Sequence, residues 1–190
     1  MTEKEKAACG MLYDANNDAE LQQEMLETRI RLHEFNQLSP REAEKRDAVL
    51  RSLLHVGCNC TILSPFHCDY GYNIHIGDNF FANVNLVILD GARLTIGDNV
   101  FIGPNVCITT AGHPLESAPR NAGLEYAHPI VIGNSVWIGA GVQILPGVTI
   151  GDGAVIGAGS VVNRDIPANV VAVGNPCRVI KTIENTSNVD

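Results

Sequence analysis

Long hydrophobic runs, excess positive charge and paired cysteines are all missing from this chain of 190 residues. No apolar run approaches the ~18 residues of a membrane-spanning helix, and the opening MTEKEKAACGM lacks the hydrophobic region of a signal peptide. Lys and Arg number 13 against 21 Asp and Glu, and the net charge of −8 argues against nucleic acid or an anionic membrane as main partner. A cytoplasmic location is therefore the default expectation.

The six cysteines form no C-x-x-C pair and no regular framework. Cys58 and Cys60 match no standard zinc spacing, and Cys107 flanks an aliphatic position of the repeat described next. We therefore expect reduced thiols, with Cys107 as a small buried hydrophobe, and no bound metal.

What the chain does contain is a repeat of six residues, clearest in IGNSVW, IGAGVQ, ILPGVT, IGDGAV and IGAGSV. A period of six fits neither the helical 3.6 nor the strand period of 2, and it marks short strands stacked coil on coil around one aliphatic ladder. The pattern therefore predicts a mainly β chain folded as a parallel β-helix. The ladder positions are Ile76, Ala82, Ile88 and Leu94, then, after a two-residue slip, Ile96, Ile102 and Ile108, and finally Ile132, Ile138, Ile144, Ile150, Ile156 and Val162.

The repeat divides the chain into an N-terminal helical segment (1–57), a β-helix (58–166) with a loop inserted at about 109–129, and a tail (167–190) that leaves the repeat. In the first segment, helical spacing of apolar residues predicts a helix from Glu20 to Phe35. Ser39-Pro40-Arg41-Glu42 predicts a second helix, with Ser39 as its N-cap, that runs to about Leu54. The polar end ENTSNVD is expected to be disordered.

The insertion at 109–129 carries no aliphatic ladder, so the scaffold holds a loop that its packing does not need. This loop contains His113 between Gly112 and Pro114. Histidine is the side chain best suited to accept a proton near neutral pH. On the residues alone, a general base and a surface histidine without a role are equally open.

Beyond the repeat, HCDYGYNIHIGDNFFAN (67–83), the GHP loop and the segment from IGNSVW to GNP resemble the maltose and galactoside O-acetyltransferases. These are hexapeptide-repeat acyltransferases that use acetyl-CoA. The similarity extends to the opening EKEKAACGMLYD and the closing VGNPCRVIK, and CDYGYN is typical of the maltose branch. The resemblance implies a left-handed β-helix and a homotrimer with active sites at the subunit interfaces.

The resemblance also implies direct attack of a sugar hydroxyl on the thioester of acetyl-CoA. A hydroxyl is protonated at pH 7, so this attack needs a base, and His113 matches the catalytic histidine of the family. Asn83 matches the asparagine beside the acceptor oxygen, and a backbone N–H near Ala140 matches the donor to the thioester oxygen. Glu125 could hydrogen-bond His113 and fix its tautomer. Without the resemblance, Asn83 would be a turn asparagine and Glu125 a solvated carboxylate.

For the acceptor, Asp14 matches a sugar-binding aspartate of the family. Asp69 occupies the position of a serine that touches the sugar in the galactoside branch. Gly91 replaces a carboxylate of that branch, with Asp90 beside it as a substitute, and Phe81 replaces a tyrosine. These departures favour a glucose- or maltose-type acceptor, and a galactoside stays open.

For acetyl-CoA, the resemblance points to the last coils and the tail. Small residues leave room for the pantetheine arm, and basic residues suit the CoA phosphates. The only tryptophan either borders the acyl channel or packs at the trimer interface. The residues expected at the cofactor are Trp137, Ala140, Ala158, Asn163, Arg164, Arg178 and Lys181.

Other functions of the same repeat stay open. An acetyltransferase of this fold could act on an antibiotic, on serine or on a nucleotide sugar. A γ-type carbonic anhydrase needs three histidines on zinc, whereas the loop has only His113 and His128, with His67 and His75 in different settings upstream. A non-catalytic β-helix scaffold would have no reason to combine a GHP loop with a cationic tail.

Overall fold

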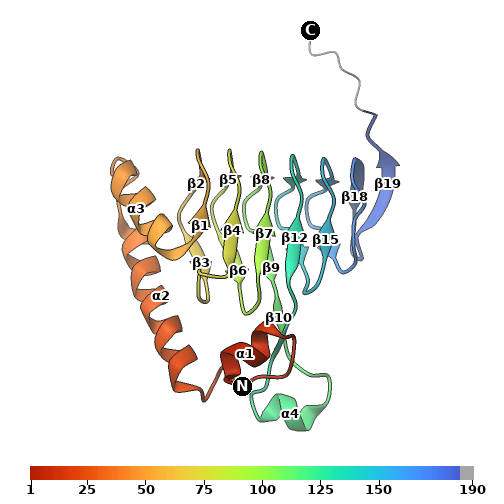
Figure 1. Ribbon diagram of the computed structural model, residues 1–190. Coiled ribbons are helices and arrows are strands. Elements are labelled where there is room, and N and C mark those ends of the chain that lie inside the picture. Colours follow the sequence, from red (N-terminus) through yellow and green to blue (C-terminus); the bar gives the residue numbers. More distant parts are fainter. Residues whose placement is uncertain (185–190) are drawn as a thin grey trace.

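The computed structural model describes residues 1–184, and its main body is a solenoid of short stacked strands (Figure 1). The strands form three sheets, in which neighbours in space come from successive coils. In the later coils Ile138 pairs with Ile156, 18 residues on, whereas in the earlier coils Ile76 pairs with Ile96, 20 residues on. The predicted parallel β-helix is confirmed, and longer early coils account for the two-residue slip of the ladder.

The three sheets are the faces of the solenoid, and all their strand pairs except β18–β19 are parallel. Sheet 1 contains β1 (His55–Val56), β4 (Ile74–Ile76), β7 (Leu94–Ile96), β12 (Ile130–Ile132) and β15 (Thr149–Ile150). Sheet 2 contains β2 (Thr61–Ile62), β5 (Phe81–Ala82), β8 (Phe101–Ile102), β13 (Trp137–Ile138), β16 (Val155–Ile156), β18 (Val170–Val173) and β19 (Arg178–Thr182). Sheet 3 contains β3 (Phe66–Cys68), β6 (Leu86–Leu89), β9 (Cys107–Thr109), β14 (Gln143–Ile144) and β17 (Val161–Val162).

The core of the solenoid is the aliphatic ladder that the sequence predicts. Every ladder residue is buried, including the small Ala82 at 0% exposure. Between the sheets the chain bends through residues with positive φ, among them Asn79, Asn99 and Gly153. Asparagine and glycine tolerate this backbone region, which explains their regular places outside the ladder. The stacking extends to β18, past the boundary at 166 that the hexads predict, and β19 then folds back on it.

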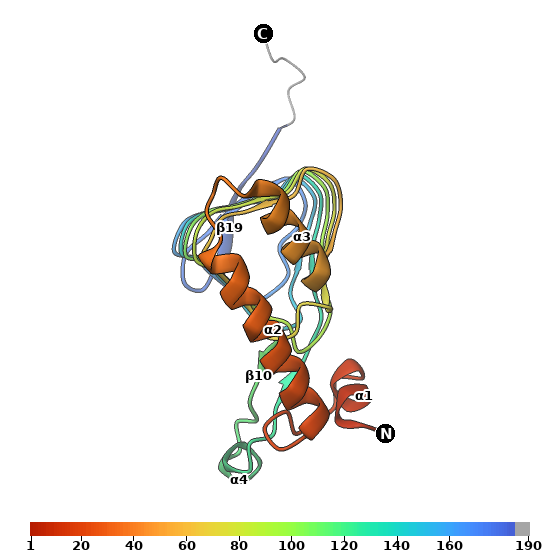
Figure 2. The same cartoon turned by 90° about the vertical axis from the view of Figure 1, so that its left-hand side faces the viewer.

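Helices close the first coil. α2 (Ala19–Gln37) and α3 (Ala43–Leu53) lie across its open end, and Phe35 and Leu50 join the solenoid core (Figure 2). The first predicted helix is confirmed, and Asp18 accepts from the Leu21 N–H as its N-cap. The predicted start of the second is wrong by three residues, because Ser39 and Glu42 close a turn on each other and the N-cap is Glu42 instead of Ser39.

The insertion folds into an antiparallel pair, β10 (Ala111–Gly112) and β11 (Tyr126–Ala127), with α4 (Ser117–Asn121) between the two strands. It projects from the solenoid on the same side as α1 (Glu3–Ala8) (Figure 1). Within residues 1–184, no helix combines the length and the apolarity needed to cross a bilayer. The expectation of disorder at the polar C-terminus falls on residues 185–190, which lie outside the described part of the chain.

Candidate active site

His113 follows β10, and its ring is oriented by a carbonyl of the same loop. Nδ1 lies 3.0 Å from the Leu124 carbonyl oxygen. Because a carbonyl can only accept, this hydrogen bond requires the proton on Nδ1 and leaves the lone pair on Nε2. Nε2 lies 4.0 Å from Oε1 of Glu125, and the His113 side chain is half exposed. In the neutral ring, Nε2 is therefore the nitrogen with the lone pair that a general base requires, and it lies beside a carboxylate.

Glu125 is held by the N-terminal segment. The N–H of Tyr13 donates to the Glu125 carbonyl, and the N–H of Glu125 donates to the Tyr13 carbonyl, both at 3.0 Å. The Tyr13 hydroxyl also donates to Oε2 of Glu125 at 3.1 Å. Burial raises the pKa of Tyr13 far above its ordinary value, so this hydroxyl keeps its proton and remains a donor.

His113 and Glu125 border a cavity of about 310 Å³ between α2 and the edge of sheet 3. Asp69, which follows β3, faces the same cavity, as does Arg29 of α2. Burial raises the pKa of the Asp69 carboxyl to about 6, the charges of Asp90 and Glu125 add to the increase, and Arg29 opposes it. The structure thus brings together three of the residues that the sequence assigns to catalysis or acceptor binding.

Asp90 lies beneath this cavity and does not face it. Its side chain is 0% exposed, and its carboxylate accepts from the N–H groups of Asp69, Tyr70 and Gly71 at 2.7–3.0 Å. Burial raises the pKa of Asp90, and the three donors act in the opposite direction. Against the expectation of a sugar contact, Asp90 shapes the turn that presents Asp69.

Asp14 is also occupied within its own segment. Its carboxylate accepts from the backbone of Asn16 and from the backbone and side chain of Asn17. The bonds to Asn17 lower the pKa of Asp14. Its neighbours Tyr13 and Ala15 line the His113 cavity, whereas Asp14 itself does not.

Asn83 lies at the opposite edge of sheet 3 from His113. It precedes β6, whereas Asp69, Asp90 and His113 all come after the strands of this sheet. β6 has four residues, and at ~3.3 Å per residue the two edges are more than about 10 Å apart. The Asn83 side chain accepts from the Val84 N–H at 2.8 Å. A single chain therefore does not bring Asn83 to His113.

The edge that carries Asn83 also carries Ala140 and Ala158, where the backbones of successive coils are in close contact. A Cβ on Gly103 would lie 2.7 Å from the Ala140 nitrogen, and one on Gly139 would lie 2.6 Å from the Ala158 nitrogen. Ala140 is exposed, and within residues 1–184 its N–H donates no hydrogen bond. This N–H is free to donate to a ligand oxygen.

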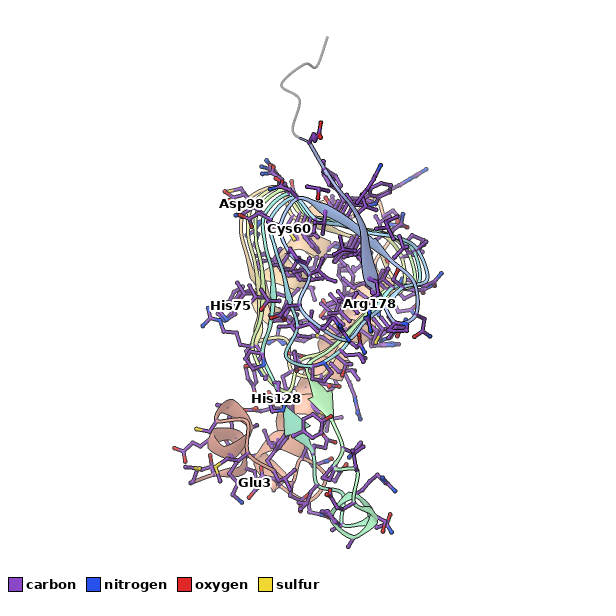
Figure 3. The ribbon with its side chains drawn as sticks, turned by 90° about the vertical axis from the view of Figure 1, so that its right-hand side faces the viewer. Glu3, Cys60, His75, Asp98, His128 and Arg178 are labelled. Atoms are coloured by element: carbon purple, nitrogen blue, oxygen red, sulfur yellow. The ribbon has the colours of Figure 1, made fainter. Side chains whose placement is uncertain are left out.

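The three basic residues expected at the cofactor, Arg164, Arg178 and Lys181, lie at the C-terminal end of the solenoid, where Figure 3 shows Arg178. Arg178 donates to the Asn163 side chain at 3.3 Å and to the Cys177 carbonyl at 2.6 Å. Arg164 and Lys181 are exposed and form no ion pair with the described residues.

Trp137 lies on the outer face of sheet 2, where it is 58% exposed. Phe101, its partner in the parallel register, is 54% exposed, and Phe81 follows on the next strand. This aromatic row leads directly into the edge with Asn83 and Ala140. Contiguous exposed apolar side chains are typical of an interaction surface.

The histidines do not converge on a common point in the described part of the chain. His75 stacks on His55 on sheet 1 with ring centroids 4.3 Å apart, and His128 lies against Tyr126 in the inserted loop. Among residues 1–184, no three His, Cys, Asp or Glu side chains form a group that could hold a metal ion.

The sequence patterns do not predict a role for Tyr13 or Arg29. Tyr13 stands beside Asp14 in the opening motif, and this adjacency is the one signal that could have found it. Arg29 is one polar residue among many on α2, and only the packing of that helix against β3 places it at the cavity.

Comparisons with known proteins agree with this architecture. Three family profiles match: the maltose acetyltransferase hexapeptide capping motif at residues 6–57, the hexapeptide repeat of succinyl-transferase at 93–117, and the bacterial transferase hexapeptide at 129–164. Galactoside O-acetyltransferase of Escherichia coli is 48% identical over 166 residues, which cover 87% of this chain and 82% of that protein.

Two solved structures are similarly close. A galactoside acetyltransferase in complex with coenzyme A has a TM-score of 0.94 at 47% identity, covering 97% of this chain and 92% of that one. A maltose O-acetyltransferase of Clostridium difficile 630 has a TM-score of 0.91 at 51% identity, covering 97% of this chain and 99% of that one.

Proposed function

The chain belongs to the maltose and galactoside O-acetyltransferase family, and from this premise we propose that it moves an acetyl group from acetyl-CoA to a sugar hydroxyl. The observation that carries the proposal is the arrangement of His113. Its Nε2 is left free to accept a proton beside Glu125, at a cavity that also holds Asp69. A base and hydrogen-bond acceptors at one cavity suit a hydroxylic substrate.

The reaction follows from these groups. Nε2 of His113 takes the hydroxyl proton as the sugar oxygen bonds to the thioester carbon, and the carbonyl electron pair moves onto oxygen. The free N–H of Ala140 suits that developing charge. When the C–S bond breaks, the imidazolium returns its proton to the CoA thiolate. The carboxylate of Glu125, 4.0 Å from Nε2, stabilises the imidazolium between these steps.

The acceptor site extends along α2. A second cavity, of about 490 Å³, shares Arg29, Asp69 and Leu89 with the His113 cavity. Its wall also carries His33 and His67. Carboxylates and imidazoles can each hydrogen-bond sugar hydroxyls. We infer a continuous groove that takes a sugar of maltose type, with Asp69 at the unit that reacts and Asp14 near its entrance.

Residues of the proposed site lie on both edges of sheet 3, and this supports a homotrimer with its active sites at the interfaces. Asn83 and Ala140 lie far from His113 in one chain, and the exposed row of Phe101 and Trp137 adjoins them. If this edge of one subunit faces the inserted loop of the next, Asn83 reaches the reacting hydroxyl and the aromatic row is covered.

Acetyl-CoA would lie along the edge that carries Ala140 and Ala158, with its pantetheine arm against their small side chains. Its phosphates would meet the basic side chains of Arg164, Arg178 and Lys181 at the C-terminal end of the solenoid. The proposed contacts are Trp137, Ala140, Ala158, Asn163, Arg164, Arg178 and Lys181.

We place the enzyme in the cytoplasm. Each of the six cysteines is unpaired, and Cys9 and Cys58 are exposed. Free thiols of this kind suit a reducing compartment.

The experiment that tests the proposed function measures thiol release from acetyl-CoA by the purified protein. Maltose, glucose and a galactoside are offered as acceptors, with chloramphenicol and serine beside them. We expect release that depends on a sugar and is fastest with a maltose- or glucose-type acceptor. Release that depends only on serine or chloramphenicol would assign the chain to another acetyltransferase of the same fold.

A further inference from the structure

We propose that Tyr13 is a positioning residue of the active site, which acts on His113 through Glu125. The inference deepens the acetyl transfer proposed above and rests on it. It concerns two segments: the N-terminal strap, residues 12–16, and the inserted loop, residues 109–129.

The strap is hydrogen-bonded to the inserted loop although the two are far apart in sequence. Tyr13 and Glu125 exchange both backbone hydrogen bonds at 3.0 Å, as neighbours in an antiparallel pair do. The side-chain amide of Asn16 donates to the Gly123 carbonyl at 2.7 Å. With the bond from the Tyr13 hydroxyl to Glu125, the strap makes four hydrogen bonds to two residues of the loop, Gly123 and Glu125.

The position of the Tyr13 hydroxyl is fixed from several sides. The side chain is 2% exposed and packs with Leu21, Tyr70 and Ala127 in a small cluster separate from the solenoid core. Gly91 lies directly against it, because a Cβ at that position would be 2.6 Å from the hydroxyl oxygen. A side chain at position 91 would displace the hydroxyl, so Gly91 is what lets Tyr13 reach Glu125.

Both partners of the His113 ring lie in the segment of the loop just before β11, which the strap holds. Leu124 supplies the carbonyl that fixes the proton on Nδ1, and Glu125 supplies the carboxylate beside Nε2. The two carboxylate oxygens of Glu125 have different partners. Oε2 accepts a hydrogen bond from the Tyr13 hydroxyl, whereas Oε1 faces Nε2 of His113. Tyr13 therefore determines which way the carboxylate points, and the carboxylate stabilises the imidazolium.

The variant that tests this is Tyr13→Phe, which keeps the ring in place and removes only the hydroxyl. We expect kcat to fall about tenfold, equivalent to about 1.4 kcal/mol of transition-state stabilisation. The KM for acetyl-CoA should stay unchanged, because Tyr13 lies on the acceptor side. Tyr72→Phe is the matched control: it removes a hydroxyl that donates to Glu24 at 2.8 Å, and kcat should not change.

A double-mutant cycle separates action through Glu125 from a general loss of structure. In a Glu125→Ala background the hydroxyl has no carboxylate to hold, so adding Tyr13→Phe should change kcat by less than about twofold. An equal loss of kcat in both backgrounds, or an unchanged kcat for Tyr13→Phe alone, would overturn the proposal.

A measurement that does not depend on catalysis can distinguish failure of this proposal from failure of the proposed function. The ring nitrogen signals of His113 in NMR, assigned from the His113→Ala spectrum, should shift in Tyr13→Phe and Glu125→Ala but not in Tyr72→Phe. An absence of sugar-dependent thiol release from the wild-type protein would refute the enzyme assignment. Unshifted His113 signals in Tyr13→Phe would instead refute the role of Tyr13.

Discussion

At the scale of single residues, the chemistry depends on which atoms already have partners. A carbonyl occupies Nδ1 of His113, so Nε2 is the ring nitrogen available for the proposed proton transfer. The N–H groups of Asp69, Tyr70 and Gly71 all donate to the carboxylate of Asp90. The side chain of Asp69 instead remains at the cavity. Two aspartates that look equivalent in sequence thus have different roles because only one has its oxygens committed to the backbone.

His113→Ala should lower kcat by about 100- to 10,000-fold, the usual loss for a general base. The dissociation constant for acetyl-CoA, measured by calorimetry, should stay the same, because the cations expected at its phosphates lie outside the inserted loop that carries His113. Turnover near the wild-type value would remove His113 from the mechanism.

Asp69 should make stability depend on pH. Its pKa is about 6 in the folded protein against an ordinary 3.8, so from pH ~4 to ~6 the folded state holds a proton that the unfolded chain has lost. Rising pH therefore lowers the free energy of unfolding across this window, and the loss is complete above pH ~6. Asp69→Asn cannot ionise, and at pH 7.5 it should be more stable than the wild type by roughly 1–3 kcal/mol.

Urea unfolding of both proteins at fixed concentration, at pH 4 and pH 7.5, measures this difference. The advantage of Asp69→Asn should be small at pH 4. An advantage of equal size at both pH values would show that the ionisation of Asp69 is not its cause.

At the scale of elements, coil length decides where the site forms. From Ile144 to Ile150 the ladder advances by six residues across the corner between sheets 3 and 1, whereas from Ile88 to Ile96 it advances by eight. The inserted loop extends this same corner further, between Ile108 and Ile132. Because the additional residues are confined to this one corner, the three sheets stay regular. The segments at the corner include Asp69, Gly91 and His113.

The corner between sheets 2 and 3, which carries Asn83 and Ala140, has no extra residues. There the backbones of successive coils are in close contact. In Gly139→Ala the new methyl group would lie 2.6 Å from the Ala158 nitrogen, so the coils must separate. We expect a loss of roughly 1–3 kcal/mol in the free energy of unfolding, as for an overpacked core. Because Ala140 would move with the corner, acetyl-CoA should also bind more weakly. Thermal unfolding and calorimetry together measure both effects, and an unchanged affinity would move the pantetheine arm away from this corner.

At the scale of the whole molecule, the solenoid completes its core within one chain, but the residues of the proposed active site lie at two edges of sheet 3. Every ladder residue is buried without a partner subunit. Within one chain, however, the proposed base His113 and Asn83 lie at opposite edges of sheet 3. Assembly is thus proposed to complete the active site rather than the core.

Subunit mixing tests this assembly directly. His113→Ala and Asn83→Ala should each be nearly inactive alone. If both are unfolded and refolded together in equal amounts, about a quarter of the interfaces in randomly assorted trimers pair an intact His113 with an intact Asn83. Thiol release should then recover to about a quarter of the wild-type rate. A mixture no more active than the average of the two variants would show that the two residues do not combine across an interface.

The sequence by itself determined the solenoid, because a six-residue period can bury its aliphatic positions in only a few ways. The ladder, the insertion and the helix near Glu20–Phe35 could all be predicted since each depends on local spacing. The start of the next helix could not, because a turn between Ser39 and Glu42 competes with the helix for the same backbone groups.

Only the tertiary structure decided which predicted residues share a site. His113, Glu125 and Asp69 meet because two coils and the insertion end at one corner, and Tyr13 joins them from a segment 112 residues away in sequence. Asp90 and Asp14 do not line that cavity, since nearby N–H groups already occupy their carboxylates. Spacing along a chain fixes periodic packing, but a side chain's partners depend on contacts that arise when distant segments fold together.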